Sequence, residues 1–211
     1  MAKSFKKAKL KCKKASLLTL LSQKHGNIKL QKTLTIHKES TREEEKKANN
    51  KVEKFFGFRP NLFKKFDTFP VGADIFAGFA SQIVKSRPDH QLPLSQPEIE
   101  YLGVKCSEEN ECIYLFSHHK ALLEQLLRDD ANKISDEKRA ALDDFAHIIT
   151  KEPKKAGNDV LLNKFKDAGF TDAQFKHALM VAGVFSVASK WCLANSISLE
   201  EDFNKIYNLE Q

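Results

Sequence analysis

Two adjoining stretches decide the fold: Ser95-Gln-Pro-Glu-Ile-Glu-Tyr-Leu-Gly-Val-Lys-Cys106 and Asn110-Glu-Cys-Ile-Tyr-Leu-Phe-Ser-His-His119. In the first, the opening serine and Glu98 have the spacing of a capping box, and a proline lies in the first turn, where its missing N–H costs little. This predicts a helix over residues 96–106. The second begins a run over residues 110–127 whose apolar positions recur every three or four residues, which predicts a helix facing the core. That stripe comprises Cys112, Leu115, Phe116, His119, Leu122, Leu123 and Leu126.

Helix signals recur along the rest of the chain. Ser135 is a predicted N-cap, and Thr171 with Gln174 forms a second capping box that opens a long helix through Trp191. No stretch shows the sustained alternation of a strand, and no repeat with a fixed period is evident. We therefore predict an all-α fold. Further helices are expected over residues 41–57 (with Thr41 and Glu44 as a capping pair), 73–85 and 158–168.

The charge of the chain is concentrated at one end. The net charge is +7 over 211 residues, but residues 1–50 hold 14 Lys and Arg against 4 Glu, whereas residues 51–211 hold 21 basic and 24 acidic side chains. The sequence thus predicts a basic N-terminal extension over residues 1–40 and a helical domain over residues 41–211. A basic arm of this kind binds nucleic acid, anionic lipid or another acidic partner, or else it is a solvated tail.

Phenylalanine and cysteine usage suggests an assembly and a cellular compartment. There are 16 Phe, and eight of them lie between residues 55 and 79, which predicts a large buried surface or a subunit interface. Four Cys do not make a disulfide scaffold, and a reduced cytoplasmic setting is expected. No stretch approaches the roughly 18 consecutive apolar residues of a membrane span, so none is predicted.

A carboxylate, a thiol and an imidazole form the candidate site: Glu100, Cys112 and His119. With Asn110 as the expected N-cap, Cys112 falls near the helix start, where free N–H groups favour a thiolate. Equally, it could be a buried, inert cysteine. His119 lies two turns from Cys112, about 10 Å along the helix axis, and so cannot deprotonate it directly. The imidazole is one turn from Leu115, which has no chemistry.

The other candidate groups are less specific. Glu100 lies near small and apolar residues of its helix, which is unfavourable unless the carboxylate is paired, and His119 is the expected partner; otherwise it is a surface carboxylate. Cys106 is a possible second thiol. His118 is expected to point to solvent or to a neighbouring subunit, because adjacent helical residues diverge by about 100°. The two histidines therefore make no metal pair, and the sequence predicts neither a metal site nor a cofactor.

Read together, these segments resemble the AhpD-like alkylhydroperoxidase / carboxymuconolactone decarboxylase family. The family pattern is a helix with a Glu, followed by roughly N-x-C-x-x-C-x-x-x-H on the next helix. Glu100, Asn110, Cys112 and His119 match it in order and spacing. The flanks are similar too, and the resemblance covers about residues 50–195. It rests further on Phe56-Gly57-Phe58-Arg59-Pro60-Asn61-Leu62, on Leu92 to Glu100, and on Leu161 to Trp191.

The departure from the family pattern is Leu115, which stands where the redox members carry the second Cys. The resemblance implies that this lost thiol attacks the peroxide and that Cys112 resolves the product. The leading prediction is an antioxidant, peroxidase-like oxidoreductase in which Cys112, alone or with Cys106 and a thiol reductant, is the redox thiol and Glu100 and His119 handle protons. The alternatives are a non-redox lyase or decarboxylase-like enzyme using Glu100 and His119, or a binding or assembly protein with a degenerate site. The family pattern also implies a homo-oligomer, a trimer or hexamer.

Overall fold

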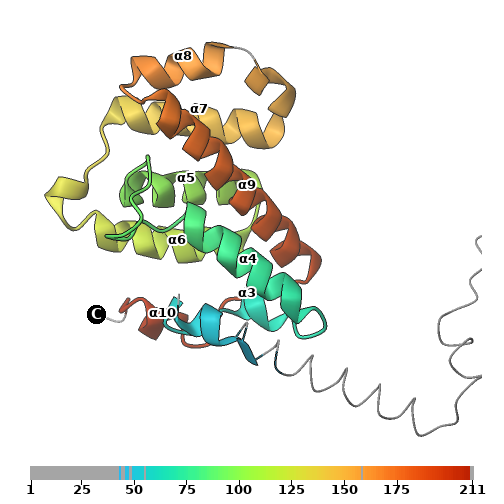
Figure 1. Cartoon of the computed structure of the whole chain (residues 1–211). Coiled ribbons are helices and arrows are strands. Elements are labelled where there is room, and N and C mark those ends of the chain that lie inside the picture. The colour runs from blue at the N-terminus through green and yellow to red at the C-terminus, as the bar shows by residue number, and fades with distance from the viewer. Residues whose placement is uncertain (1–42, 44–45, 48, 55, 158, 210–211) are drawn as a thin grey trace, which may run out of the picture. The chain divides into compact units, whose positions relative to one another are not determined.

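The structure is a computed structural model that describes residues 43, 46–47, 49–54, 56–157 and 159–209. From residue 46 onward the described residues belong to one compact unit (Figure 1). The basic extension over residues 1–40 and the predicted capping pair Thr41 and Glu44 lie outside the described residues. Residues 49–54 are helical. The chain leaves this helix at Gly57, whose φ of +79° suits a residue without a Cβ.

The prediction of an all-α fold is confirmed, because the described residues contain helices and no strand. Two short 3₁₀ turns, η1 (Asp130–Asn132) and η2 (Pro153–Gly157), flank α7. The α-helices, in chain order, are α3 (Asn61–Lys64), α4 (Pro70–Ile83), α5 (Gln96–Glu109), α6 (Ile113–Leu126), α7 (Asp136–Lys151), α8 (Asp159–Asp167), α9 (Asp172–Ala194) and α10 (Phe203–Ile206).

The predicted helix starts are present, and one predicted cap is wrong. The capping boxes of Ser95 and Thr171 are both complete, and the Ser135 side chain accepts a hydrogen bond from the Lys138 N–H. Asn110, however, ends α5 instead of starting α6: its side-chain amide donates to the Cys106 carbonyl at 2.7 Å. The two central helices are therefore Gln96–Glu109 and Ile113–Leu126, not 96–106 and 110–127.

Helix α5 lies at the centre of the fold, against α6, α7 and α9. Gly103 allows α9 to approach α5 closely, because a Cβ at this position would overlap the ring of Phe185 on α9. Phe185 is buried and in turn meets the ring of His119 on α6 edge-on, with 4.5 Å between ring centroids. The packing of three helices around one glycine thus sets where the candidate imidazole lies.

Helix α9 is the longest helix of the described chain. Over 18 residues its mean hydropathy is 1.4, so by length and composition it meets the requirement for a membrane span, which the sequence reading did not foresee. Half of that window is buried inside the protein, and its buried residues include Val181, Phe185 and Cys192. This is the pattern of a core helix with one uncovered face.

Candidate functional site

The predicted contact between Glu100 and His119 is present. Glu100 on α5 is buried, and its Oε2 lies 2.6 Å from Nδ1 of His119 on α6. A carboxylate beside Nδ1 keeps the proton on that nitrogen, which leaves Nε2 as the basic position of a neutral imidazole. Nε2 has no hydrogen-bond partner in the described part of the chain. The pair has the arrangement of a general base with its orienting carboxylate.

A third residue, Gln96, holds Glu100 in place. Its amide donates to Oε1 of Glu100 at 2.7 Å and to the Val84 carbonyl at 2.9 Å, and it accepts from the Ser86 N–H at 3.0 Å. Both carboxylate oxygens of Glu100 are therefore hydrogen-bonded. Through Gln96, the loop after α4 is also hydrogen-bonded to the Glu100–His119 pair, referred to below as the dyad. The sequence reading missed Gln96, although its position four residues before Glu100 places it on the same helix face.

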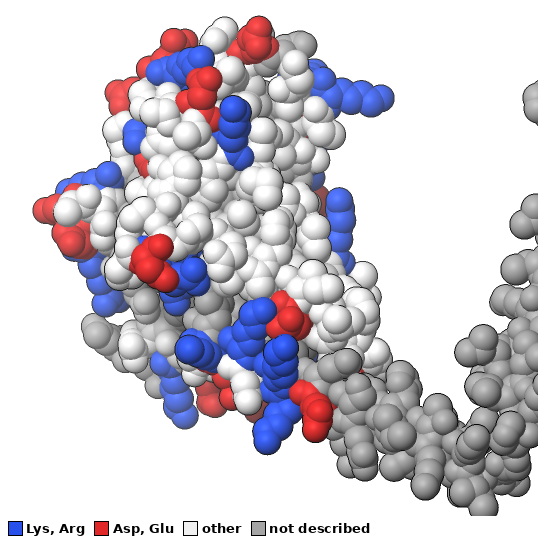
Figure 2. Space-filling model, viewed as in Figure 1, with Lys and Arg blue, Asp and Glu red and all other residues white. Residues whose placement is uncertain are grey.

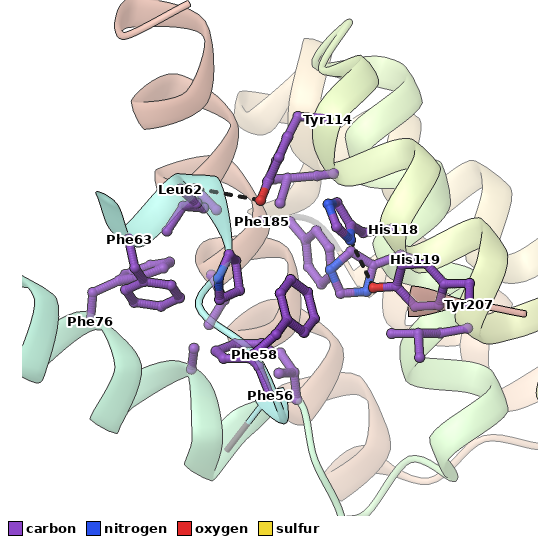
Figure 3. A pocket seen from close by; sticks show the side chains of 17 residues that line it. Phe56, Phe58, Leu62, Phe63, Phe76, Tyr114, His118, His119, Phe185 and Tyr207 are labelled. Carbon is purple, nitrogen blue, oxygen red and sulfur yellow. Dashed lines mark hydrogen bonds between the residues drawn. The ribbon is translucent and has the colours of Figure 1, made fainter. Parts of the chain in front are cut away.

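The Glu100–His119 dyad borders a pocket made of two adjoining cavities that share lining residues; they are named the inner and the outer chamber. The inner chamber has a volume of about 90 Å³, and the outer chamber about 430 Å³. Glu100 and Gln96 line only the outer one, whereas His119 lines both. Figure 3 shows aromatic side chains converging on the inner chamber from separate segments. Residues shared by the two chambers are Phe56, Phe58, Val84, His119, Leu122 and Tyr207.

Leu115 faces this pocket, whereas Cys112 does not. Leu115 lines the inner chamber, together with His119 one turn further along α6. Cys112 is the N-cap of α6, is only 1% exposed and lines neither chamber. The position that carries the second Cys in the resembled family is thus within the pocket, and here it holds an aliphatic side chain.

The thiol beside Cys112 is Cys192 on α9, which the sequence reading did not single out. The adjacent Cys192 thiol, together with the N–H groups at the start of α6, outweighs burial and lowers the pKa of Cys112. The same contact and burial raise the pKa of Cys192. The two cysteines are 80 positions apart in the sequence. The only sequence signal for Cys192 was its place in the long apolar helix α9.

Cys106, the possible second thiol, has its side chain near α7. Its side chain is fully buried and interacts with Thr150 on α7. Burial, followed by the nearby charge of Glu109, raises the pKa of Cys106 to about 12. These features are typical of a protonated core cysteine.

The expected orientation of His118 is wrong. Its side chain is buried, with Nε2 2.7 Å from Oε2 of Glu200 and Nδ1 2.7 Å from the hydroxyl of Tyr207. Both partners belong to the C-terminal segment, which returns to cover α6. Burial alone would raise the pKa of Glu200, but the adjacent imidazole of His118 and the hydrogen bonds from the Asn61 N–H and the Tyr114 hydroxyl lower it to about 2.

Comparisons with known proteins agree on the fold. A crystal structure of an alkylhydroperoxidase AhpD core, an uncharacterized peroxidase-related protein from Ralstonia eutropha JMP134, is 24% identical, with a TM-score of 0.57 over 72% of this chain and 83% of that one. A peroxidase-related protein from Silicibacter sp. TM1040 is 19% identical, with a TM-score of 0.62 over 77% and 87%.

The debrominase Bmp8, solved in complex with 2,3,4-tribromopyrrole, is 16% identical, with a TM-score of 0.56 over 78% of this chain and 89% of that one. The sequence itself matches no protein-family profile and no curated protein sequence. The chain therefore has the AhpD-like fold, as the resemblance implied.

Proposed function

We propose that the protein is a non-redox acid–base enzyme in which Nε2 of His119 removes a proton from a small apolar substrate and Glu100 stabilises the imidazolium that forms. One observation carries this proposal. The imidazole of the Glu100–His119 dyad lines the pocket beside Leu115, whereas Cys112 does not line the pocket. Proton abstraction next to a carbonyl is the reaction class, as in isomerases and lyases.

The lining of the pocket supports a compact, largely apolar substrate. Aromatic rings make up much of the inner chamber, while polar side chains gather in the outer one. A ring lactone fits this division, with its ring in the inner chamber and any carboxyl group outside. The debrominase with the same fold was solved with a brominated pyrrole, which is also a small apolar ring. Apolar chambers with a few convergent polar groups are typical of such sites.

A peroxidase-like oxidoreductase is the second candidate, favoured by the lowered pKa of Cys112 and by its contact with Cys192. The Cys112 thiolate would attack the terminal oxygen of an organic hydroperoxide, breaking the O–O bond and releasing an alcohol after proton uptake. Cys192 would then attack the resulting sulfenic acid, forming a disulfide and releasing water. A thiol reductant would restore both thiols by exchange.

Replacing Cys112 by serine separates the two candidates. The assay is the exchange of C–H protons for deuterium in D₂O, followed by NMR over a panel of small ring lactones and aryl ketones. We expect Cys112→Ser to retain the wild-type exchange rate within about twofold, because the sulfur does not meet the pocket. Cys106→Ser is the matched control, since it alters another buried thiol.

A different result would favour the second candidate. If cumene hydroperoxide rapidly converts wild-type protein to a Cys112–Cys192 disulfide, read by intact mass, and if no panel compound exchanges, the acid–base proposal fails. Cys192→Ser should then stop at the sulfenic acid. Inert thiols together with lost exchange in Cys112→Ser would exclude both candidates.

A homo-oligomer is also proposed, with α4 and α9 at the interface. Exposed apolar side chains lie on both helices, and a hollow of about 440 Å³ between them is lined only by apolar residues. Figure 2 shows few charged side chains over this face. Apolar patches of this kind mark interaction surfaces. The hollow is lined by Phe66, Phe69, Gly72, Ile75, Phe76, Phe79, Val187 and Trp191.

Charge placed in this apolar face should dissociate the assembly. Ile75 is 64% exposed, so Ile75→Lys is expected to reduce the mass in solution from a trimer or hexamer to the single 24.0 kDa chain, measured by light scattering. Val160→Lys, at an equally exposed position on α8, is the control. A wild-type mass of one chain would contradict the proposal. The acidic partner of the basic extension and the cytoplasmic location stay predictions.

A further inference from the structure

A buried carboxylate anchors the C-terminal segment beside the inner chamber. The side chain of Glu200 is 8% exposed. Its Oε1 accepts hydrogen bonds from the Tyr114 hydroxyl at 2.6 Å and from the Asn61 N–H at 2.7 Å, and its Oε2 lies 2.7 Å from Nε2 of His118. Oε1 thus accepts two hydrogen bonds and Oε2 lies at ion-pair distance from an imidazole, which suits the ionised form.

His118 supplies the positive charge that this carboxylate needs. In the described part of the chain it is the one cationic group within ion-pair distance of Glu200. A charge removed from water is tolerated when an opposite charge compensates it, so the pair is best described as carboxylate and imidazolium. Phe58 stacks on the imidazole and Phe203 meets it edge-on, which keeps water away from the pair.

The charge on His118 decides what the Tyr207 hydroxyl can do. An imidazolium carries protons on both nitrogens, so its Nδ1–H donates to the oxygen of Tyr207 at 2.7 Å. The phenolic proton is then not used in this contact, and no other partner for it lies among the described residues. Tyr207 lines both chambers, as does His119, and Figure 3 shows the tyrosine oxygen at the pocket.

We infer that Tyr207 donates a hydrogen bond to the substrate's carbonyl oxygen, opposite the His119 base, and hence that the substrate is an apolar carbonyl compound with an acidic C–H beside the carbonyl group. The inference rests on the proposed acid–base function. His119 Nε2 takes the proton from carbon, the electron pair moves onto the carbonyl oxygen, and the enolate oxygen accepts from Tyr207. The proton then returns from His119 to carbon. The His118 charge behind Tyr207 makes its hydroxyl a stronger donor.

In this arrangement the buried contacts among Glu200, His118 and Tyr207 position the Tyr207 hydroxyl, in addition to anchoring the C-terminal segment. Gln125 donates to the Tyr207 carbonyl at 2.7 Å, so the tyrosine is fixed at its backbone as well as at its hydroxyl. A fixed donor aimed at the position of a developing oxyanion needs no rearrangement during the reaction. Glu200 and His118 are accordingly positioning residues, and Tyr207 would touch the substrate.

Binding of 4-nitrophenolate, an oxyanion on an apolar ring, tests the inference without turnover. We expect Tyr207→Phe to lower the affinity for 4-nitrophenolate about tenfold, because one hydrogen bond to a charged oxygen is lost. The affinity for uncharged 4-nitrotoluene should change less than about twofold, because the ring of residue 207 remains. Tyr101→Phe is the matched control, since its hydroxyl bonds to Asp143 and does not line the pocket.

Equal losses for the two ligands, or none for 4-nitrophenolate, would overturn the donor role. A second measurement is independent of the variants: ¹⁵N NMR of wild-type protein at pH 7 should show both nitrogens of His118 protonated. An unprotonated Nδ1 would mean that Tyr207 donates to His118, which also overturns the inference. Neither measurement needs proton exchange, so failure of the acid–base function would be seen separately in the deuterium assay.

Discussion

The variant His119→Gln is expected to lower the rate of substrate proton exchange about a hundredfold to ten-thousandfold, the usual contribution of a general base. Glutamine preserves hydrogen-bonding capacity toward Glu100 but offers no basic nitrogen to the pocket. The loss should fall on kcat rather than on KM, because the apolar lining that holds the substrate is untouched. The measurement is the initial rate of deuterium uptake by NMR at saturating substrate.

The chain contains a matched control for this variant. His147 on α7 lies 3.1 Å from Glu109 through the same nitrogen, Nδ1, but this pair is on the surface and away from the pocket. His147→Gln should therefore leave the exchange rate unchanged. Exchange by His119→Gln within about threefold of wild type would rule out His119 as the base.

The variant Glu200→Gln is expected to reduce the free energy of unfolding by about 3–5 kcal/mol, which is typical when one partner of a buried ion pair is removed. The amide leaves His118 without its counter-charge and presents N–H groups to it, while the amide oxygen can still accept the hydrogen bonds of Tyr114 and Asn61. Urea unfolding at pH 7 measures the loss. Glu109→Gln, at the surface pair with His147, should change stability by less than about 1 kcal/mol.

The pH dependence of this difference has a definite sign. The pKa of Glu200 in the folded protein is about 2, below its ordinary value. The ionised carboxylate therefore contributes stability above the pKa of the unfolded chain, near 4.3, and this contribution is lost as the pH falls toward 2. The gap in stability between wild type and Glu200→Gln should narrow over that window. A gap that stays constant from pH 5 to pH 2.5 would contradict the assignment of an ionised Glu200.

The sequence by itself determined the helical class and the pairing of Glu100 with His119. The capping boxes of Ser95 and Thr171 and the apolar stripe of α6 are local signals, since each depends on residues within one or two turns. Two consecutive helices joined by a short turn pack against each other, so a carboxylate on the inner face of the first meets an imidazole on the second. Asn110 was assigned to the wrong helix because an Asn between two helices can cap either of them.

Only the tertiary structure decided the partners of His118 and Cys112 and the shape of the pocket. Glu200 and Tyr207 lie more than 80 positions after His118, and Cys192 lies 80 positions after Cys112. Helical periodicity specifies which face of a helix is apolar, but it does not specify which distant segment covers that face. The path of the chain after α9 brings Glu200 and Tyr207 to α6. The close approach of α9 at Gly103 places Phe185 against His119. The packing of distant segments therefore supplies the pocket beside the dyad, which local sequence signals alone do not specify.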